Sequence, residues 1–337
     1  MTGASSGETL GLLLVIGAVV VFAWTNGFHD ASNAVATSVS TKALTPRIAL
    51  VMATLANLLG ALFGQRVATT VGSDLLVPPT GGAGLALLAG ALVGAVCWNL
   101  LTWRLGLPSS STHALVGGLA GAAIVAGASV RWGAILTTVV VPMLVSPVLG
   151  FALAWLTMYV LVRWLRERPV AELNRGFRYA QTVSAVAVAF GHGMQDAAKS
   201  AGVITLALVA TGRATGPEVD WWALGLAAAA MAAGTYAGGW RVMRTLGRGL
   251  VRIGPAQGFA AEAVSSVLLY AATALRLPIS TTYVVTAAIA GAGTATRGHL
   301  AVRWGMGGRI VLAWLLTLPA AGLVAAAAYG ILSVAVR

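Results

Sequence analysis

The chain has 337 residues, of which 58% are hydrophobic and 9% are charged, with a formal net charge of +12. Soluble domains carry about a quarter charged residues, so this composition excludes a soluble globular protein, although the length would suit two or three such domains. Apolar runs of membrane-spanning length recur from end to end, which identifies an all-α polytopic membrane protein.

The basic residues do not form the basic face or tail that a nucleic-acid-binding protein would need. They gather in the short connections between apolar runs, as the positive-inside rule expects. Membrane lipid is therefore an expected partner and nucleic acid is not. The single cysteine, Cys97, lies within an apolar run, so the sequence offers neither a disulfide framework nor a cysteine metal site.

Ten apolar runs predict the membrane helices in chain order. The runs of the first half are 9–24 with a weaker continuation to 41, 46–64, 84–103, 107–126 and 133–162. The runs of the second half are 179–210, 221–240, 255–275, 277–295 and 305–336. Five runs per half predict an N-terminal repeat over 1–163, a basic cytoplasmic linker over 164–178 and a C-terminal repeat over 179–337.

The basic connections also predict the orientation. The linker and the connection 241–252 are rich in arginine, so we expect both to be cytoplasmic. Counting crossings from these two connections places both termini outside. Because each half has an odd number of crossings, the second half enters the membrane from the opposite side, as an inverted-topology repeat requires.

Polar residues interrupt the first run at 26–33, where Asn26-Gly-Phe-His29-Asp30-Ala-Ser-Asn33 follows apolar sequence directly. Ionisable groups inside a membrane cost roughly 2.5–3.5 kcal/mol each, so they seldom lie there without a role. A second copy, at 192–199, follows 166 residues later and pairs Asp30 with Asp196 and Asn33 with Lys199. Two such acidic motifs in matching segments point to the substrate site of a transporter, and they predict broken helices or re-entrant segments.

A second pair of motifs carries hydroxyl groups. The string Pro108-Ser-Ser-Ser-Thr112-His113 aligns with Pro278-Ile-Ser-Thr-Thr282-Tyr283 at an offset of 170. Proline in the first turn and serine or threonine at the cap are typical of a helix N-terminus. Such a terminus, placed in the membrane, offers an anion site for phosphate, sulfate or carboxylate. The alternative is that these hydroxyls merely cap buried helices. The candidates are Ser110, Ser111, Thr112, Ser280, Thr281 and Thr282.

Three acids, Asp30, Asp196 and Glu262, lie within apolar sequence. Fixed carboxylates would repel an anion, so we expect them to bind the cations that accompany it. Asp30, Asn33 and Asp196 offer oxygen ligands of the kind sodium prefers, and the same acids can instead bind and release protons. Lys199 either pairs with Asp196 or faces the anion.

His29 lies where coupling would occur, and two interpretations stay open for it. Histidine ordinarily changes its charge near neutral pH, so His29 can shuttle a proton. It can equally well hydrogen-bond a break in the helix. His192 has the same two possible roles.

These motifs resemble those of the inorganic phosphate transporter (PiT) family, in its bacterial low-affinity branch. The acidic motifs match the Gly-Ala-Asn-Asp-like signature of that family, and the hydroxyl strings match its Pro-x-Ser-Thr-Thr-His string, over nearly the whole chain. The resemblance implies an inverted-repeat helical fold, often dimeric, in the bacterial cytoplasmic membrane. It further implies uptake of inorganic phosphate with a co-transported proton or sodium ion by alternating access.

The resemblance also assigns residues to the site. The six hydroxyl candidates, with Asp30, Asn33 and Asp196, would form the phosphate and cation sites, and Glu262 matches an acidic position of the family. We further expect Gln195 and Lys199 to bind phosphate, and His29 and Glu262 to take part in cation coupling. His29 and Gln195 stand where the family has asparagine. Loss of the amide oxygen at His29 favours protons over sodium. The Phe-His-Asp variant resembles the proton-coupled branch, for which a divalent metal complexed with phosphate is an alternative cargo.

The alternatives divide into two kinds. A sulfate permease or a sodium-coupled phosphate symporter would have the same fold. A channel or a structural scaffold would belong to another class, and the duplicated charged motifs argue against a scaffold. The sequence contains no nucleotide-binding or zinc motif and no spacing of nucleophile and base, so we expect a protein that is not an enzyme and has no bound cofactor.

Overall fold

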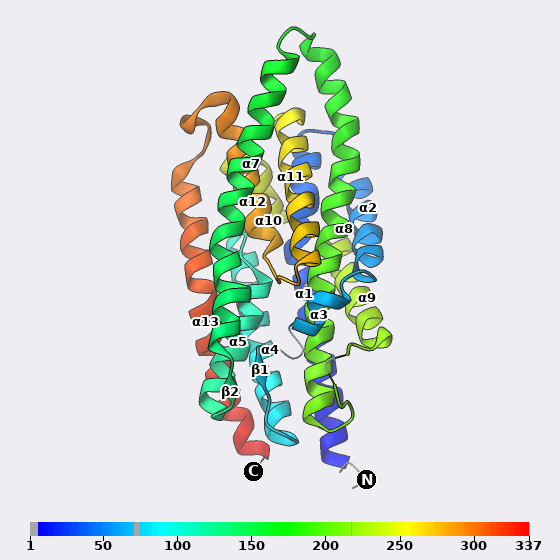
Figure 1. Cartoon of the computed structure of the whole chain (residues 1–337), viewed down its shortest axis with the longest axis vertical. Coiled ribbons are helices and arrows are strands. Elements are labelled where there is room, and N and C mark those ends of the chain that lie inside the picture. The colour runs from blue at the N-terminus through cyan, green and yellow to red at the C-terminus, as the bar shows by residue number, and fades with distance from the viewer. Residues whose placement is uncertain (1–5, 71–74, 217, 337) are drawn as a thin grey trace.

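The structure is a computed structural model that describes residues 6–70, 75–216 and 218–336. Helices account for most of the described residues and pack side by side along one long axis (Figure 1). A short antiparallel ladder joins β1 (Leu76–Val77) to β2 (Ser129–Val130).

The helices follow the ten predicted runs closely. Those of the first half are α1 (Ser6–Ser40), α2 (Pro46–Ala61), α3 (Gln65–Thr69), α4 (Gly82–Leu105), α5 (Ser111–Ala126), α6 (Trp132–Ala134), the π-helical turn η2 (Ile135–Val140) and α7 (Val141–Leu165). Those of the second half are α8 (Val170–Ala210), α9 (Trp221–Ala237), α10 (Trp240–Arg244), the π-helical turn η3 (Thr245–Leu250), α11 (Pro255–Ala274), α12 (Thr281–Arg297), the 3-10 turn η4 (His299–Ala301) and α13 (Trp304–Val336).

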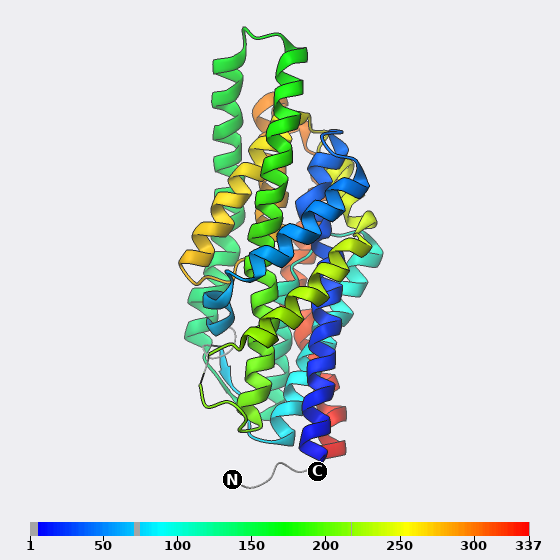
Figure 2. The same ribbon diagram turned by 90° about the vertical axis from the view of Figure 1, so that its right-hand side faces the viewer.

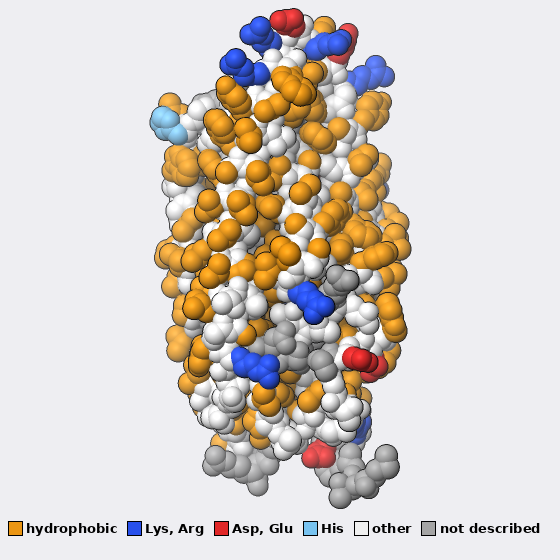
Figure 3. Space-filling model, viewed as in Figure 1, with side chains coloured by type: hydrophobic (Ala, Val, Ile, Leu, Met, Phe, Trp, Pro, Cys, Tyr) orange, Lys and Arg blue, Asp and Glu red, His pale blue; other side chains and the backbone are white. Residues whose placement is uncertain are grey.

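The surface between the two ends of the molecule is apolar. Within the described residues, four helical segments are long and apolar enough to cross a membrane: Ser6–Ser40, Gly82–Leu105, Trp132–Leu165 and Trp304–Val334. Figure 3 shows hydrophobic side chains over most of this flank, with Lys and Arg gathered at the end that holds the α7–α8 connection. Because water-soluble proteins do not expose apolar surface on this scale, the chain is an integral membrane protein.

Both chain ends lie at one end of the molecule, and the α7–α8 connection lies at the other (Figure 1). The hydrophilic linker predicted over 164–178 is largely helical, because α7 continues to Leu165 and α8 begins at Val170. Pro169 stands at the N-cap of α8, where the fixed φ of proline suits the start of a helix. The arginine-rich segment therefore extends two long helices beyond the apolar flank.

Two helical hairpins enter the molecule from opposite ends. Figures 1 and 2 show α4 and α5 entering from the end with the chain termini, and α11 and α12 entering from the end with the α7–α8 connection. Each hairpin turns through a residue with left-handed backbone, Gly106 (φ 66°) in the first and Arg276 (φ 60°) in the second. Both hydroxyl strings therefore lie at hairpin tips inside the protein.

The acidic motifs do not break their helices, which corrects the prediction made from the sequence. Helix α1 runs without interruption through 26–33 and α8 through 192–199. Neither motif contains a proline. The polar residues of α1 at 26, 30, 33 and 37 are three or four positions apart, so they share one helix face. The chain is non-helical at the hairpin turns 107–110 and 277–280 instead.

Glycine in each acidic motif allows helices to cross closely. A Cβ built at Gly27 would lie 2.1 Å from the carbonyl oxygen of Met231 on α9. A Cβ built at Gly193, the same position of the second motif, would lie 2.1 Å from the carbonyl oxygen of Asn57 on α2. Small residues of this kind are the usual means of tight helix packing in membranes.

The buried apolar residues form two large clusters on either side of the polar centre. One includes Phe22, Leu88 and Leu115, and the other includes Val188 and Ile289. The centre between them contains the polar motifs. The packing on both sides therefore fixes the positions of buried groups that would be costly to leave without partners.

Candidate functional site

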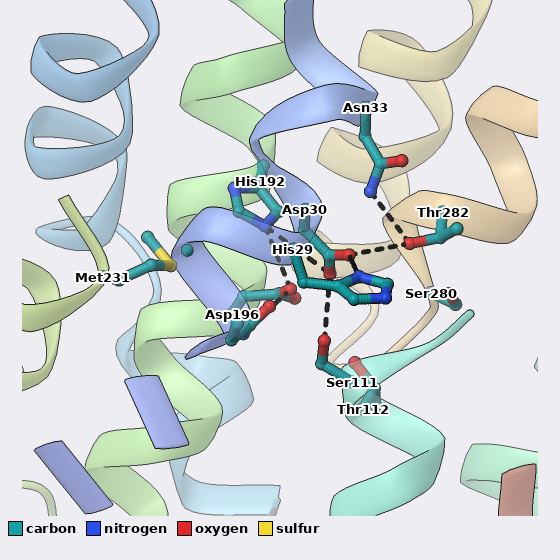
Figure 4. A network of polar contacts seen from close by, with 12 residues as sticks. His29, Asp30, Asn33, Ser111, Thr112, His192, Asp196, Met231, Ser280 and Thr282 are labelled. Carbon is teal, nitrogen blue, oxygen red and sulfur yellow. Dashed lines mark hydrogen bonds and ion pairs between the residues drawn. The ribbon is translucent and has the colours of Figure 1, made fainter. Parts of the chain in front are cut away.

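Asp30 is hydrogen-bonded to the tips of both hairpins (Figure 4). Its Oδ2 accepts from Ser111 Oγ at 3.3 Å, at the start of α5, and its Oδ1 accepts from Thr282 Oγ1 at 3.2 Å, at the start of α12. All three side chains are buried. One carboxylate on α1 therefore connects elements that are far apart in the sequence.

Lys199 on α8 makes the matching set of contacts. Its Nζ donates to Asp196 Oδ1 at 2.8 Å, to Thr112 Oγ1 at 2.7 Å and to the Ile279 carbonyl oxygen at 2.8 Å. An ammonium group has three donors, so all of them are used. Pairing with Asp196, one of the two alternatives for Lys199, is present, and the same ammonium also contacts the hydroxyl of a hairpin tip.

The long helix of each half contacts the hairpin of the other half. Lys199, on α8, contacts Thr112 of the first hairpin. Its counterpart Asn33, on α1, donates from Nδ2 to Thr282 Oγ1 of the second hairpin at 2.8 Å. The residues paired by the sequence alignment thus make equivalent contacts to the opposite half.

Both nitrogens of the His29 ring are engaged within the protein. Nδ1 lies 2.7 Å from Asp30 Oδ1, and Nε2 lies 3.1 Å from Thr102 Oγ1 near the end of α4. The ring is fully buried. His29 therefore contacts the acid as well as the hairpin helix. Helix α1 is not broken at this position, and a proton-shuttle role for His29 stays a prediction.

His192, for which the sequence left the same two roles open, lies beside both acids of the site. Its Nε2 lies 3.1 Å from Asp196 Oδ2 and 4.0 Å from Asp30 Oδ2, and its Nδ1 lies 3.0 Å from Asn57 Oδ1. The alignment of the motifs contained the signal, because His192 occupies the position of Asn26. Asn26 in turn donates from Nδ2 to Asp196 Oδ2 at 3.3 Å.

This arrangement could hold a cation. Asp30, His192 and Asp196 offer three ligand atoms within 4.8 Å of one another. In the described part of the chain, Asn26 Oδ1 and Asn33 Oδ1 are buried and have no hydrogen-bond partner. Carboxylate and amide oxygens suit sodium, whereas an imidazole between two carboxylates suits a proton or a transition metal.

The hydroxyl candidates divide into helix caps and groups that face the site. Ser110 Oγ accepts from the His113 amide at 3.2 Å, and Ser280 Oγ accepts from the Tyr283 amide at 3.3 Å. These two serines therefore act as N-caps. Of the four residues that follow them, Ser111 and Thr282 bond to Asp30 and Thr112 bonds to Lys199, whereas Thr281 Oγ1 has no hydrogen-bond partner among the described residues. With them, the N-termini of α5 and α12 direct unpaired N–H groups and positive dipole ends towards the polar centre.

Gln195 contacts the second hairpin and not the carboxylates. Its Nε2 donates to Thr273 Oγ1 at 2.9 Å and to the Leu277 carbonyl oxygen at 3.3 Å. Gln195 is the counterpart of His29, which contacts Thr102 near the end of α4. Each of these residues therefore contacts a hairpin through a side-chain hydrogen bond.

Glu262 lies in a separate polar cluster further along α1. It accepts hydrogen bonds from Thr37 Oγ1, from Ser184 Oγ at 2.5 Å and from Gln181 Nε2 at 3.2 Å. The structure therefore does not bring Glu262 into contact with the Asp30–Asp196 centre. Thr37 follows Asp30 by two helical turns, so α1 connects the two clusters. Ser184 and Gln181 could not be recognised from the sequence, because single polar residues in an apolar run are usually interhelical contacts.

A membrane-embedded helical protein with a duplicated, charged polar site between its halves has the construction of a transporter. Comparison with known proteins identifies the family. A family model described as the phosphate transporter family matches residues 26–325, and the chain belongs to this family. The resemblance found in the motifs is thus confirmed.

Relatives match over almost the whole chain. The chain is 43% identical over 324 residues to a probable low-affinity inorganic phosphate transporter of Mycobacterium bovis, covering 95% of this chain and 77% of the relative. It is 42% identical over 331 residues to a protein of Rhizobium meliloti with the same description, covering 95% and 97%. A solved structure of a sodium-dependent phosphate transporter has a TM-score of 0.84 at 26% identity, covering 96% and 99%. The chain is accordingly a transporter and not an enzyme.

Proposed function

We propose that this protein imports inorganic phosphate across the bacterial cytoplasmic membrane by proton-coupled symport. The observation that carries the proposal is the contact of Asp30 with both hairpin tips, where hydroxyl groups and helix N-termini converge. Such a set of donors suits a tetrahedral oxyanion. The family and the names of the relatives support phosphate as the cargo.

In this mechanism hydroxyl groups bind the phosphate anion, and carboxylates bind the co-transported cations. Phosphate oxygens accept from Thr112 and Thr282 and from the first N–H groups of α5 and α12. Lys199 transfers one of its three donors from Asp196 to the phosphate. Asp30 and Asp196 then retain the positive charge that accompanies the anion.

The charge balance explains why coupling is needed. The centre contains two buried carboxylates, Asp30 and Asp196, and one buried ammonium, Lys199, so its net charge is −1 when both histidines are neutral. Dihydrogen phosphate adds one further negative charge. Protons on His29 and His192 would make the occupied site neutral. Because uncompensated charge is costly in a low-dielectric interior, a fully occupied site can be occluded and a partly occupied one resists occlusion.

His29 and His192 favour a proton as the coupling ion. Each ring contacts a carboxylate, so a proton can be shared between imidazole and acid without large movement. Sodium is the second candidate, since the solved structural neighbour is sodium-dependent, and it would use Asp30, Asn33 and Asp196. A divalent metal that enters with phosphate would use Asp30, His192 and Asp196.

We further infer that the halves are inverted repeats that rock against each other to give alternating access. The crosswise contacts and the opposite entry of the hairpins support this inference. In this arrangement the termini lie outside and the arginine-rich connection lies in the cytoplasm, as the positive-inside rule favours.

Uptake of labelled phosphate into proteoliposomes tests the proposal. We expect an inward proton gradient to drive accumulation without sodium, arsenate to compete, and sulfate to have little effect. Chelation of divalent metals distinguishes free phosphate from a metal complex. Accumulation driven by sodium alone would contradict proton coupling, and accumulation of sulfate in preference to phosphate would contradict the cargo.

A further inference from the structure

Arg276 has a backbone conformation that its side chain makes unfavourable. Its φ is 60°, in the left-handed region that glycine occupies without strain. The equivalent position of the first hairpin is Gly106, with φ 66°. The two turns also close in the same way. The Leu107 amide donates to the Thr102 carbonyl oxygen at 2.9 Å, and the Leu277 amide donates to the Ala272 carbonyl oxygen at 2.9 Å. Glycine would therefore suit the turn, and the arginine side chain calls for a separate explanation.

The side chain of Arg276 lines an open pocket of about 480 Å³ at the protein surface. The pocket lies between α3, the α8–α9 connection and the second hairpin turn, and its polar lining includes Gln65, Glu218, Asp220 and Arg276. Arg276 is exposed. Within the described ranges, no hydrogen bond or ion pair is made by its guanidinium. The group is therefore available to an anion.

The second hairpin contacts both the pocket and the polar centre. The Arg276 carbonyl oxygen accepts from Thr70 Oγ1 at 3.2 Å, and the next carbonyl, of Leu277, accepts from Gln195 Nε2 at 3.3 Å. Gln195 precedes Asp196 in the chain. The same turn thus presents Arg276 to the pocket, while Thr282, a few residues later, contacts Asp30.

We propose that this pocket is an entry site that captures phosphate before it reaches the Asp30–Asp196 centre, with Arg276 as the anion-binding residue. The inference rests on the proposed function, because it takes phosphate as the cargo. A guanidinium group can bind two phosphate oxygens with its planar pair of donors. Glu218 and Asp220 line the same pocket. Their negative charges attract the accompanying cation and weaken the binding of phosphate, so the anion can leave the pocket for the Asp30–Asp196 centre. The α8–α9 connection lies at the end of the molecule with the chain termini, which is the side from which import begins.

The test compares phosphate uptake by Arg276→Gly, Arg276→Gln and Arg276→Lys in proteoliposomes. At low ionic strength, the glycine and glutamine variants should need about tenfold more phosphate for half-maximal uptake. This is the smallest effect expected, because electrostatic attraction raises the local concentration of a charged ligand by about 10- to 1,000-fold. Their maximal rates should be unchanged, and the lysine variant should retain most of the wild-type value. The difference should shrink in high salt, because the screening length falls from about 30 Å at 0.01 M to about 3 Å at 1 M.

Two controls make the result specific. Arg213→Gln removes another cation of the α8–α9 connection, one that bonds Thr9, and should leave half-saturation unchanged. Thermal denaturation should show Arg276→Gly to be at least as stable as the wild type, since glycine suits the turn.

Unchanged half-saturation in the glycine and glutamine variants would overturn the entry site, as would a loss of maximal rate with half-saturation unaltered. Failure of the wild-type protein to take up phosphate would refute the proposed function itself.

Discussion

Lys199 Nζ and Thr112 Oγ1 are joined by a hydrogen bond of 2.7 Å that connects the long helix of the second half to the hairpin of the first. The counterpart bond, from Asn33 Nδ2 to Thr282 Oγ1 at 2.8 Å, connects the long helix of the first half to the hairpin of the second. Because both bonds are buried, neither hairpin can shift without breaking a polar contact in the site. We therefore expect ligand binding at this site to be coupled to the position of the hairpins.

Replacement of Lys199 by methionine should destabilise the protein. The substitution leaves Asp196 buried without its ammonium partner, and breaking a buried ion pair by removing one partner costs about 3–5 kcal/mol. Thermal denaturation in detergent measures the loss. The double variant Lys199→Met with Asp196→Asn should recover most of the stability. A double variant as unstable as the single one would show that Lys199 acts through its other contacts.

Asp30→Asn should abolish phosphate uptake and leave the protein folded. The amide keeps the shape of the side chain but removes the charge that accepts from Ser111 and Thr282 and faces His29. Because a hydrogen bond to a charged group contributes about 1.5–3 kcal/mol, the loss should exceed about tenfold. Uptake in proteoliposomes measures the effect, and gel filtration monitors folding. Wild-type uptake would remove Asp30 from the mechanism.

Glu262→Gln should separate binding from transport. Glu262 accepts from Thr37, Ser184 and Gln181, and it does not contact the Asp30–Asp196 centre. Equilibrium binding of labelled phosphate should therefore stay within about twofold of wild type, because distant sites without shared partners usually couple by no more than about 0.3–0.5 kcal/mol. Proton-driven uptake should fall, because the amide no longer binds and releases a proton. Equal loss of binding and uptake would indicate that Glu262 supports the binding site.

Gly27→Ala should prevent the close crossing of α1 and α9. The added methyl would overlap the carbonyl oxygen of Met231 at 2.1 Å, and overpacking of this kind costs about 1–3 kcal/mol or more. Gly17→Ala is the matched control, since a Cβ there meets nothing within 4 Å on the same helix. Melting temperatures should fall for Gly27→Ala and stay level or rise for Gly17→Ala. Equal behaviour of the two variants would contradict the close packing.

The helices and the polar motifs could be predicted from the sequence because their signals are local. Apolar length marks each helix, and a carboxylate such as Asp30 within an apolar run is costly enough to mark a site. The alignment of Asn33 with Lys199 also predicted which residues are equivalent. It did not show that each contacts the hairpin of the opposite half.

The remaining features depend on contacts between distant segments. The sequence left two roles open for His192, and its contact with Asn57 on α2, 135 residues away in the chain, could not be read from it. The continuity of α1 and α8 was missed because polar side chains can break a helix or line one face of it, and the packing of neighbouring helices decides between the two. Likewise, the hairpin imposes the left-handed backbone conformation of Arg276. It could not be predicted from the sequence, because arginine rarely adopts this conformation.

The most direct test of the account is the equilibrium binding of labelled phosphate to the purified protein and to the double variant Thr112→Val with Thr282→Val. Valine keeps the side-chain shape and removes both hydroxyls, and Thr205→Val is the control, since Thr205 bonds within its own helix. A binding site at the hairpin tips predicts saturable wild-type and control binding and at least about a tenfold loss of affinity in the double variant, because each hydrogen bond to a charged ligand contributes about 1.5–3 kcal/mol. Unaltered phosphate affinity in the double variant would contradict a binding site at the hairpin tips.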